Sequence, residues 1–175
     1  AFGINSRGQR ARSGGWGPVL GDEGSGYDIG RKALMAVMRS CDGRGPQTSL
    51  ARRILRHLKL DHPEQLVGYV YGARMGVPMI AELASIVLDE SKRGDLVSQR
   101  IVEDAAKELT EAALSVVEKL GMEKGPVEVV VCGGAFEYCD ILRNSVKIAL
   151  QKALPNATVA HPRFDSAAGG PYFLA

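Results

Sequence analysis

The segment 14–26 is the feature that most constrains how this chain folds. Six of its thirteen residues are glycine. Glycine is needed where the backbone takes a positive φ or approaches a ligand closely, so this density predicts a shaped loop. The loop holds the only tryptophan of the sequence, Trp16, and ends in Asp22, Glu23 and Ser25, where an apolar periodicity begins. We expect at least one of these three residues to cap a helix.

The run from Gly14 to Ser25, Gly-Gly-Trp-Gly-x-x-x-Gly-Asp-Glu-Gly-Ser, resembles the sugar-site loop of a known family. That family is the N-acetylglucosamine kinase branch of the BadF/BadG/BcrA/BcrD-type ATPases, in the actin and hexokinase superfamily. The resemblance implies four substrate-binding residues: Gly15, Trp16, Gly17 and Asp22. A carboxylate accepts hydrogen bonds from two vicinal hydroxyls, and an indole shields an apolar sugar face. Asp22 is therefore either a sugar ligand or a plain helix cap.

Composition narrows the class of protein. With 175 residues and 45% hydrophobic content, the chain can bury a core and fits one domain. A net charge of +2, from 22 basic and 20 acidic residues, does not indicate a nucleic-acid partner. The sequence contains neither an apolar run of membrane-spanning length nor a signal peptide, so we expect a cytoplasmic protein without a membrane partner.

The three cysteines are Cys41, Cys132 and Cys139. They are odd in number and lack C-x-x-C spacing, which argues against a disulfide framework or a zinc site. We expect buried, reduced thiols and no metal site in this chain.

The first part of the chain predicts a hairpin followed by helices. Residues 1–5 and the stretch up to Arg12 are strand-like and are joined by the turn candidate Asn5-Ser6-Arg7-Gly8. Apolar periodicity then predicts a series of helices at about 22–40, from Thr48 or Ser49 to 58, at 63–71, from 77 onward and at 94–120. The second of these helices has a basic face made of Arg52, Arg53, Arg56 and Lys59. This face is either a solvated helix surface or a patch for phosphate or nucleic acid.

The second part predicts a strand, a Gly-Gly turn and a helix. Residues 126–132 form a β-branched run typical of a buried strand, and a helix is expected at about 137–154. Gly133 and Gly134 between them either form a simple steric turn or let the backbone touch a nucleotide at the end of the strand. Val-Cys-Gly-Gly-Ala-Phe also resembles the adenosine motif of the same superfamily, which implies that Gly133 and Gly134 bind ATP.

The end of the chain predicts a short strand at 157–160 and a last helical segment. Asp165 or Ser166 can cap that segment, and Pro171 would interrupt it.

This order of elements is an α/β order, compatible with a ribonuclease H-like lobe that carries a helical insertion at about residues 46–120. The resemblance implies that residues 1–175 are the C-terminal lobe of a two-lobed, ATP-dependent kinase. Its substrate would be a hydroxyl of an amino sugar, such as N-acetylglucosamine, or of a related hexose. The implied cofactors are ATP and Mg²⁺, the partners are the sugar and ATP, and the full-length protein is expected to be a homodimer. The family's catalytic base and phosphate loops lie in the N-terminal lobe, so no catalytic residue is assigned and the isolated chain is expected to be inactive.

Two other functions stay open. Other members of the family are ATPase activators of 2-hydroxyacyl-CoA dehydratases or subunits of benzoyl-CoA reductase, with an iron–sulfur cluster at a subunit interface. Cys132 and Cys139, at a strand end and a helix start, do not look like a cluster pair. A non-catalytic module that senses ATP or sugar is the second alternative.

The expected fold also makes a prediction about strand pairing. In a ribonuclease H-like sheet the first strand is central, and the residues that would form it precede Ala1. The strands at 1–5 and 127–132 should therefore not be hydrogen-bonded to each other. Open strand edges are templates for association, so the isolated chain should be marginally stable or pair with another chain.

Overall fold

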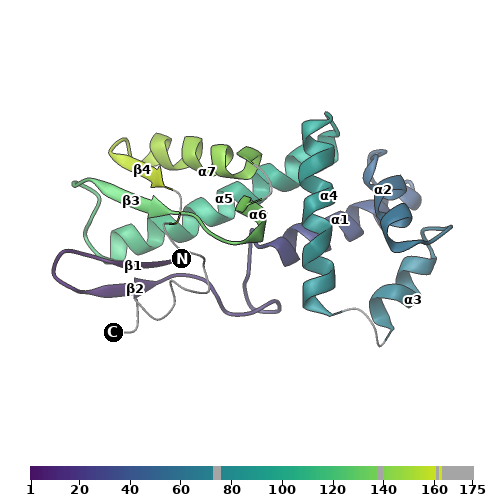
Figure 1. The fold of residues 1–175 in the computed structure, drawn as a ribbon, viewed down its shortest axis with the longest axis horizontal. Coiled ribbons are helices and arrows are strands. Elements are labelled where there is room, and N and C mark those ends of the chain that lie inside the picture. Colours follow the sequence, from purple (N-terminus) through teal and green to yellow (C-terminus); the bar gives the residue numbers. More distant parts are fainter. Residues whose placement is uncertain (73–75, 138–139, 161, 163–175) are drawn as a thin grey trace.

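The structure, a computed structural model, describes residues 1–72, 76–137, 140–160 and 162. Within this part of the chain, four strands form two separate two-stranded sheets, and seven helices accompany them (Figure 1). The two sheets lie toward one end of the molecule, and the helices of residues 50–71 lie at the other. The chain is thus a mixed α and β protein, as predicted. None of the described helices has the length and apolar character needed to cross a membrane.

The chain begins with the predicted hairpin. Strand β1 (Phe2–Ile4) pairs antiparallel with β2 (Arg10–Arg12). The Asn5 side chain closes the turn, because its oxygen accepts hydrogen bonds from the backbone N–H groups of Arg7 and Gln9, each at 3.0 Å.

Five helices follow between the two sheets: α1 (Gly26–Cys41), α2 (Leu50–Leu58), α3 (Gln65–Tyr71), α4 (Val77–Lys92) and α5 (Leu96–Lys119). Each matches a helix predicted from apolar periodicity. The predicted start of α1 at Asp22 is four residues too early, because Ser25 is the N-cap and Asp22 has a left-handed backbone with φ 61°. Pro78 lies in the first turn of α4, where its missing N–H costs nothing.

The second sheet pairs β3 (Val127–Val130) parallel to β4 (Ala157–Ala160). Between them lie α6 (Gly134–Glu137) and α7 (Asp140–Ala153), so helical structure begins at Gly134, three residues before the predicted start at 137. Strands β1 and β3 belong to different sheets, which confirms the prediction that they are not paired. The predicted last helical segment lies outside the described residues.

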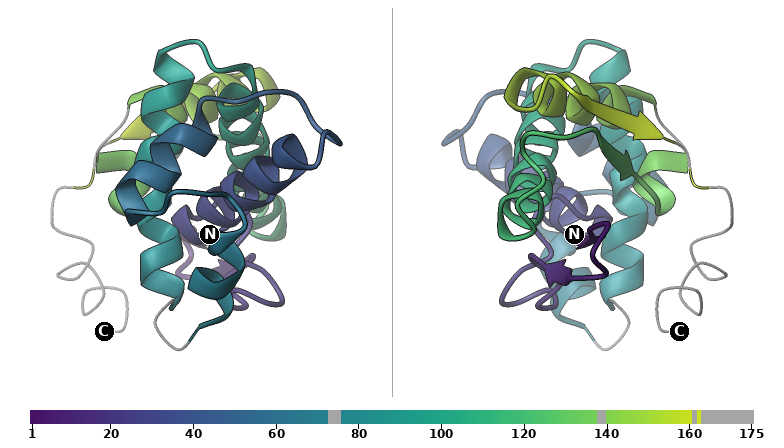
Figure 2. Two further views of the ribbon diagram at one scale, coloured as in Figure 1. Left: turned by 90° about the vertical axis from the view of Figure 1, so that its right-hand side faces the viewer. Right: turned by 90° about the vertical axis from the view of Figure 1, so that its left-hand side faces the viewer.

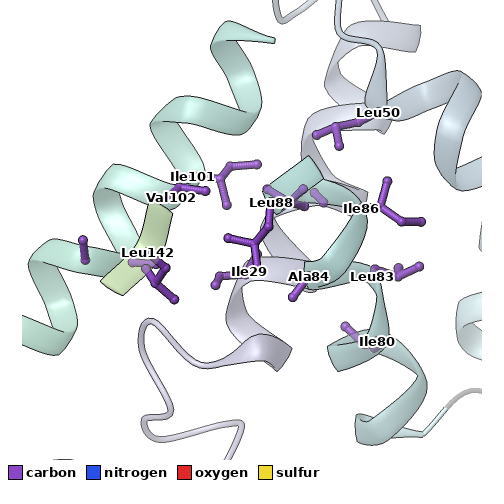
Figure 3. Packing of buried hydrophobic residues seen from close by; sticks show 14 of the residues in the cluster. Ile29, Leu50, Ile80, Leu83, Ala84, Ile86, Leu88, Ile101, Val102 and Leu142 are labelled. Carbon is purple, nitrogen blue, oxygen red and sulfur yellow. The ribbon is translucent and has the colours of Figure 1, made fainter. Parts of the chain in front are cut away.

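The core forms where α1 crosses α4. Ile29 of α1 and Leu88 of α4 are almost completely buried, and Val102 of α5 and Leu142 of α7 join the same cluster (Figure 3). The crossing is close because Gly30 presents no side chain: a methyl group there would overlap the carbonyl oxygen of Ile80.

Helix α5 supports the hairpin. A methyl group at Gly3 of β1 would come within 2.5 Å of Val116 Cγ1, so only glycine lets β1 pack this closely on α5. Lys119 Nζ donates a hydrogen bond of 3.1 Å to the carbonyl oxygen of Arg12. The loop that follows β2 therefore starts from a fixed position.

The expectation of buried thiols is wrong for two of the cysteines. Cys41 and Cys132 are free, as predicted, but both are exposed. Cys41 is the last residue of α1, and Cys132 follows the end of β3, so neither lies on a core-facing side of an element. Cys139 lies outside the described residues.

Candidate functional site

The glycine-dense loop between β2 and α1 takes its shape from a series of left-handed residues. Gly14, Gly15, Gly17 and Gly24 have φ values of 74°, 71°, 84° and 74°. Asp22 shares this conformation with φ 61°, which is uncommon for a residue other than glycine and persists where the surroundings enforce it. The loop therefore has a defined geometry and does not behave as a linker, as its composition predicted.

The carboxyl end of the loop is fixed on α5. A methyl group at Gly24 would lie 2.7 Å from the carbonyl oxygen of Ala105 and from Leu109 Cγ, so the backbone there is in close contact with the helix. The Gly24 N–H donates to Asp28 Oδ2 at 3.1 Å, and the Asp28 N–H donates to Ser25 Oγ at 3.2 Å. These reciprocal bonds join the loop to the first turn of α1.

Asp28 is a buried carboxylate that the sequence interpretation missed. It is 5% exposed. Its Oδ1 lies 3.0 Å from Arg31 Nη2, and its Oδ2 lies 2.8 Å from Lys32 Nζ. Burial raises the pKa of Asp28, but the hydrogen bonds from Lys32, Gly24 and Arg31 together outweigh burial and hold the pKa below its ordinary value. The spacing Ser25-x-x-Asp28 is a capping-box signature and could have identified this residue.

Trp16 lies on the surface of the loop. Its side chain is 62% exposed, and the guanidinium carbon of Arg12 lies 4.2 Å from the ring centroid, a cation–π contact. Gly21 lies against the backbone of Trp16, because a methyl group there would be 3.2 Å from the Trp16 nitrogen. The loop thus folds back on itself and brings Trp16 close to the residue that precedes Asp22.

Asp22 does not cap α1. Ser25 occupies the N-cap position, while the backbone carbonyl of Asp22 accepts a hydrogen bond of 3.0 Å from the Ser25 N–H. The Asp22 carboxylate is partly exposed and has no hydrogen bond or ion pair to any residue that the structure describes. Of the two interpretations of Asp22, the plain cap is therefore wrong, and a carboxylate free to accept hydrogen bonds from a ligand remains.

A cavity of about 320 Å³ lies beside this loop and the first turns of α1. It is lined by Pro18, Val19, Leu20, Gly21, Glu23, Tyr27, Asp28 and Arg31. Its volume is at the lower end of the range for small-molecule sites, and its lining combines apolar side chains with charged groups that can bond hydroxyls. None of the four predicted sugar-binding residues lines this cavity. They adjoin it in the loop, with Gly17 before Pro18 and Asp22 between Gly21 and Glu23.

Gly133 and Gly134 lie at the carboxyl end of β3. Gly133 has φ 109°, and no described atom lies within 4 Å of the position that a side-chain carbon would take. Gly134 is the first residue of α6, and the Phe136 N–H donates to the Gly133 carbonyl at 2.9 Å. Among the described residues, the side-chain position of Gly133 is therefore open, so a ligand could approach the backbone closely there.

Among residues 1–72, 76–137, 140–160 and 162, no three His, Cys, Asp or Glu side chains lie where they could hold a metal ion together. No residue is therefore assigned to Mg²⁺.

Comparison with known families shows to which family this chain belongs. The model of the BadF/BadG/BcrA/BcrD ATPase family matches residues 1–170. The chain belongs to this family. Among curated members, an N-acetylmuramic acid/N-acetylglucosamine kinase of Clostridium acetobutylicum is 40% identical over 168 residues, 96% of this chain and 55% of the relative. An N-acetyl-D-glucosamine kinase of Dictyostelium discoideum is 35% identical over 171 residues, 97% of this chain and 54% of the relative.

Solved structures agree with the family at the level of fold. A protein of Chromobacterium violaceum, provisionally named N-acetylglucosamine kinase, matches 99% of this chain and 55% of its own, with a TM-score of 0.73 and 24% identity. A similarly named protein of Porphyromonas gingivalis matches 89% of this chain and 48% of its own, with a TM-score of 0.60 and 17% identity. This BadF/BadG/BcrA/BcrD family chain spans about half the length of the curated relatives that it matches.

Proposed function

We propose that this chain is the C-terminal lobe of an ATP-dependent kinase that transfers the γ-phosphate of ATP to a hydroxyl of an amino sugar similar to N-acetylglucosamine. The observation that carries the proposal is the 40% identity, across 96% of this chain, to an N-acetylmuramic acid/N-acetylglucosamine kinase. An ATPase activator with an iron–sulfur cluster fits less well, because the curated relatives are named as sugar kinases. A sensing module without turnover would bind ATP or sugar without phosphorylating the sugar.

The proposed fold of this lobe is ribonuclease H-like. A hairpin, a set of helices and then a parallel β3–β4 pair follow the order expected of a ribonuclease H-like lobe. The helices α2 to α5 would then be the helical insertion at about residues 46–120. We propose in addition a homodimeric, cytoplasmic full-length protein.

In the proposed sugar site, the chain's own residues bind and orient the substrate. Asp22 accepts hydrogen bonds from vicinal hydroxyls, which fits its free and partly exposed carboxylate. Trp16 covers an apolar face of the ring with the part of its indole that Arg12 leaves exposed. Gly15 and Gly17 give backbone groups close access, because neither has a described atom within 4 Å of its side-chain position.

In the proposed nucleotide site, Gly133 and Gly134 lie against the adenosine. ATP supplies the phosphoryl group, and Mg²⁺ is the expected companion of that transfer. The open space at Gly133 fits a bound nucleotide.

A panel of sugars with ATP tests the activity itself. The full-length protein should phosphorylate N-acetylglucosamine or a close relative, as measured by ADP release coupled to detection of the sugar phosphate. ADP release without a phosphorylated sugar would point to the ATPase-activator function. Binding without either product would point to the sensing module.

Asp22→Asn tests the sugar site. Asparagine tolerates the left-handed backbone of Asp22 and is neutral, so the free energy of unfolding should change little. The KM for sugar should rise about tenfold or more through loss of a charge-assisted hydrogen bond, while the KM for ATP stays the same. Asp61→Asn, in an exposed turn, removes the same charge and is the matched control. An unchanged sugar KM in Asp22→Asn would contradict the assignment.

Gly134→Val tests the nucleotide site. A β-branched side chain at this turn would fill space proposed for the nucleotide, so ATP affinity should fall about tenfold or more while sugar affinity is kept. Gly125→Val, two residues before β3, is the control, since no described atom lies within 4 Å of the side-chain position of Gly125. Equal ATP affinity of the two variants, measured by calorimetry, would reduce the Gly-Gly pair to a simple turn.

A further inference from the structure

A second cavity shares no lining residue with the cavity beside the glycine-dense loop. Its volume is about 480 Å³, and it lies between α2 and the junction of α4 with α5. Helix α2 is at the end of the molecule opposite the two sheets (Figure 1), and it faces the viewer in the left view of Figure 2. The lining residues are Ser49, Arg52, Arg53, Arg56, Glu90, Arg93, Gly94 and Asp95. Four arginines thus share one cavity with two carboxylates.

The carboxylate of Glu90 is already paired. Glu90 is 4% exposed, and its Oε1 lies 3.1 Å from Arg53 Nε and 3.7 Å from Arg93 Nε. Ser49 Oγ also donates a hydrogen bond to Glu90. This carboxylate therefore neutralises Arg53 and part of the charge of Arg93 and has little capacity left for a further cation.

The carboxylate of Asp95 is saturated as well. It accepts hydrogen bonds from the backbone N–H groups of Ser49 and Ser98, each at 2.8 Å. The hydroxyls of Thr48 and Ser98 donate to it too, at 2.8 to 3.0 Å. Its acceptor positions are thus taken by uncharged donors of the chain.

Arg52 and Arg56 are left without a counter-charge. Both are exposed, and neither guanidinium group has an ion pair or hydrogen bond to any residue in the described part of the chain. They lie four residues apart, one turn of α2, so both guanidinium groups face the same cavity. Like charges at this spacing repel each other, and the dipole of α2 favours only Arg56, which lies in the last turn of the helix. An anion bound between them would remove this repulsion.

We propose that this cavity binds the phosphate group of a small phosphorylated molecule, with Arg52 and Arg56 as the main ligands and Arg93 as a third. Guanidinium groups match the geometry of phosphate oxygens and bind them in pairs. The cavity volume suits a small molecule. An extended nucleic acid is disfavoured, because the chain carries a net charge of only +2 and Asp89 and Glu90 lie beside the arginines. Two residues of the basic face of α2, Arg52 and Arg56, thus belong to the proposed phosphate site.

The test compares two charge-matched double variants. R52Q/R56Q removes the proposed ligands, and R100Q/K147Q removes two exposed charges from α5 and α7 that do not line the cavity. Calorimetry with inorganic phosphate and with glucose 6-phosphate should give at least a tenfold weaker affinity for R52Q/R56Q and an unchanged affinity for R100Q/K147Q. Hydrogen exchange should show ligand-dependent protection at residues 49–56 and 90–95.

The two probes also distinguish the sources of the phosphate. Tighter binding of glucose 6-phosphate than of inorganic phosphate supports a phosphorylated metabolite, and equal affinities support the free ion. Absence of binding by both probes, equal weakening in the two double variants, or protection only outside 49–56 and 90–95 would overturn the proposal. These readouts are binding measurements, so they do not depend on the proposed kinase activity.

Discussion

Gly30→Ala should lower the free energy of unfolding by about 3 kcal/mol, because it forces apart the two helices that form the core. The new methyl group would overlap the Ile80 carbonyl oxygen, which belongs to the backbone of α4 and cannot rotate away. Helix α1 or α4 would have to shift, and with it the packing of Ile29 and Leu88. Denaturant unfolding, followed by circular dichroism, measures the loss.

Gly68→Ala is the matched control for this change. Gly68 is also a helical glycine, in α3, but it faces open space. Alanine there should raise the free energy of unfolding by about 0.5–1 kcal/mol, since it restricts the unfolded chain without a clash. If Gly30→Ala were as stable as the original protein, the close crossing of α1 and α4 would be wrong.

Asp95→Ala should lower the free energy of unfolding by about 3 kcal/mol, because this one carboxylate holds two helices together. It is the N-cap of α5 and also binds the backbone N–H of Ser49 at the start of α2. Removing it leaves both N–H groups and the Thr48 hydroxyl without their acceptor. Asp104→Ala, on the exposed side of α5, removes the same charge and should change stability by less than about 0.5 kcal/mol.

The effect of Asp95 should depend on pH. Burial raises the pKa of Asp95, but the hydrogen bonds from Ser98, Ser49 and Thr48 outweigh burial and hold the pKa below its ordinary value of 3.8. A carboxyl whose pKa is lower in the folded state stabilises the fold above that ordinary value, and the stabilisation is lost as the pH falls toward the folded pKa. The stability difference between the original protein and Asp95→Ala should therefore be full at pH 6 and shrink below about pH 4. If this stability difference grew on acidification, the lowered pKa of Asp95 would be contradicted.

Local signals predicted most of the secondary structure. The turn Asn5–Gly8 marked the hairpin, the β-branched run before Cys132 marked β3, and apolar periodicity marked α1 to α5. The start of α1 was ambiguous because Asp22, Glu23 and Ser25 are all good caps. Only the fold selects Ser25, by placing Gly24 against α5 and turning Asp22 into a left-handed conformation.

The contacts that define the two cavities could not be predicted in this way. Thr48 and Asp95 are 47 residues apart, and nothing local to either residue signals that they meet. The basic face of α2 was visible in the sequence, but the pairing of Arg53 with Glu90, which leaves Arg52 and Arg56 free, depends on how α2 packs on α4. The predicted sugar and nucleotide residues came from motif resemblance, and their roles stay predictions.

Trp16 makes the loop detectable by fluorescence. Trp16 is the only tryptophan among these 175 residues, so fluorescence of this chain excited at the red edge of indole absorption originates in the loop alone. The guanidinium of Arg12 on β2 lies over this indole ring. A change in emission on addition of a sugar would therefore report a change in the loop or in its contact with β2.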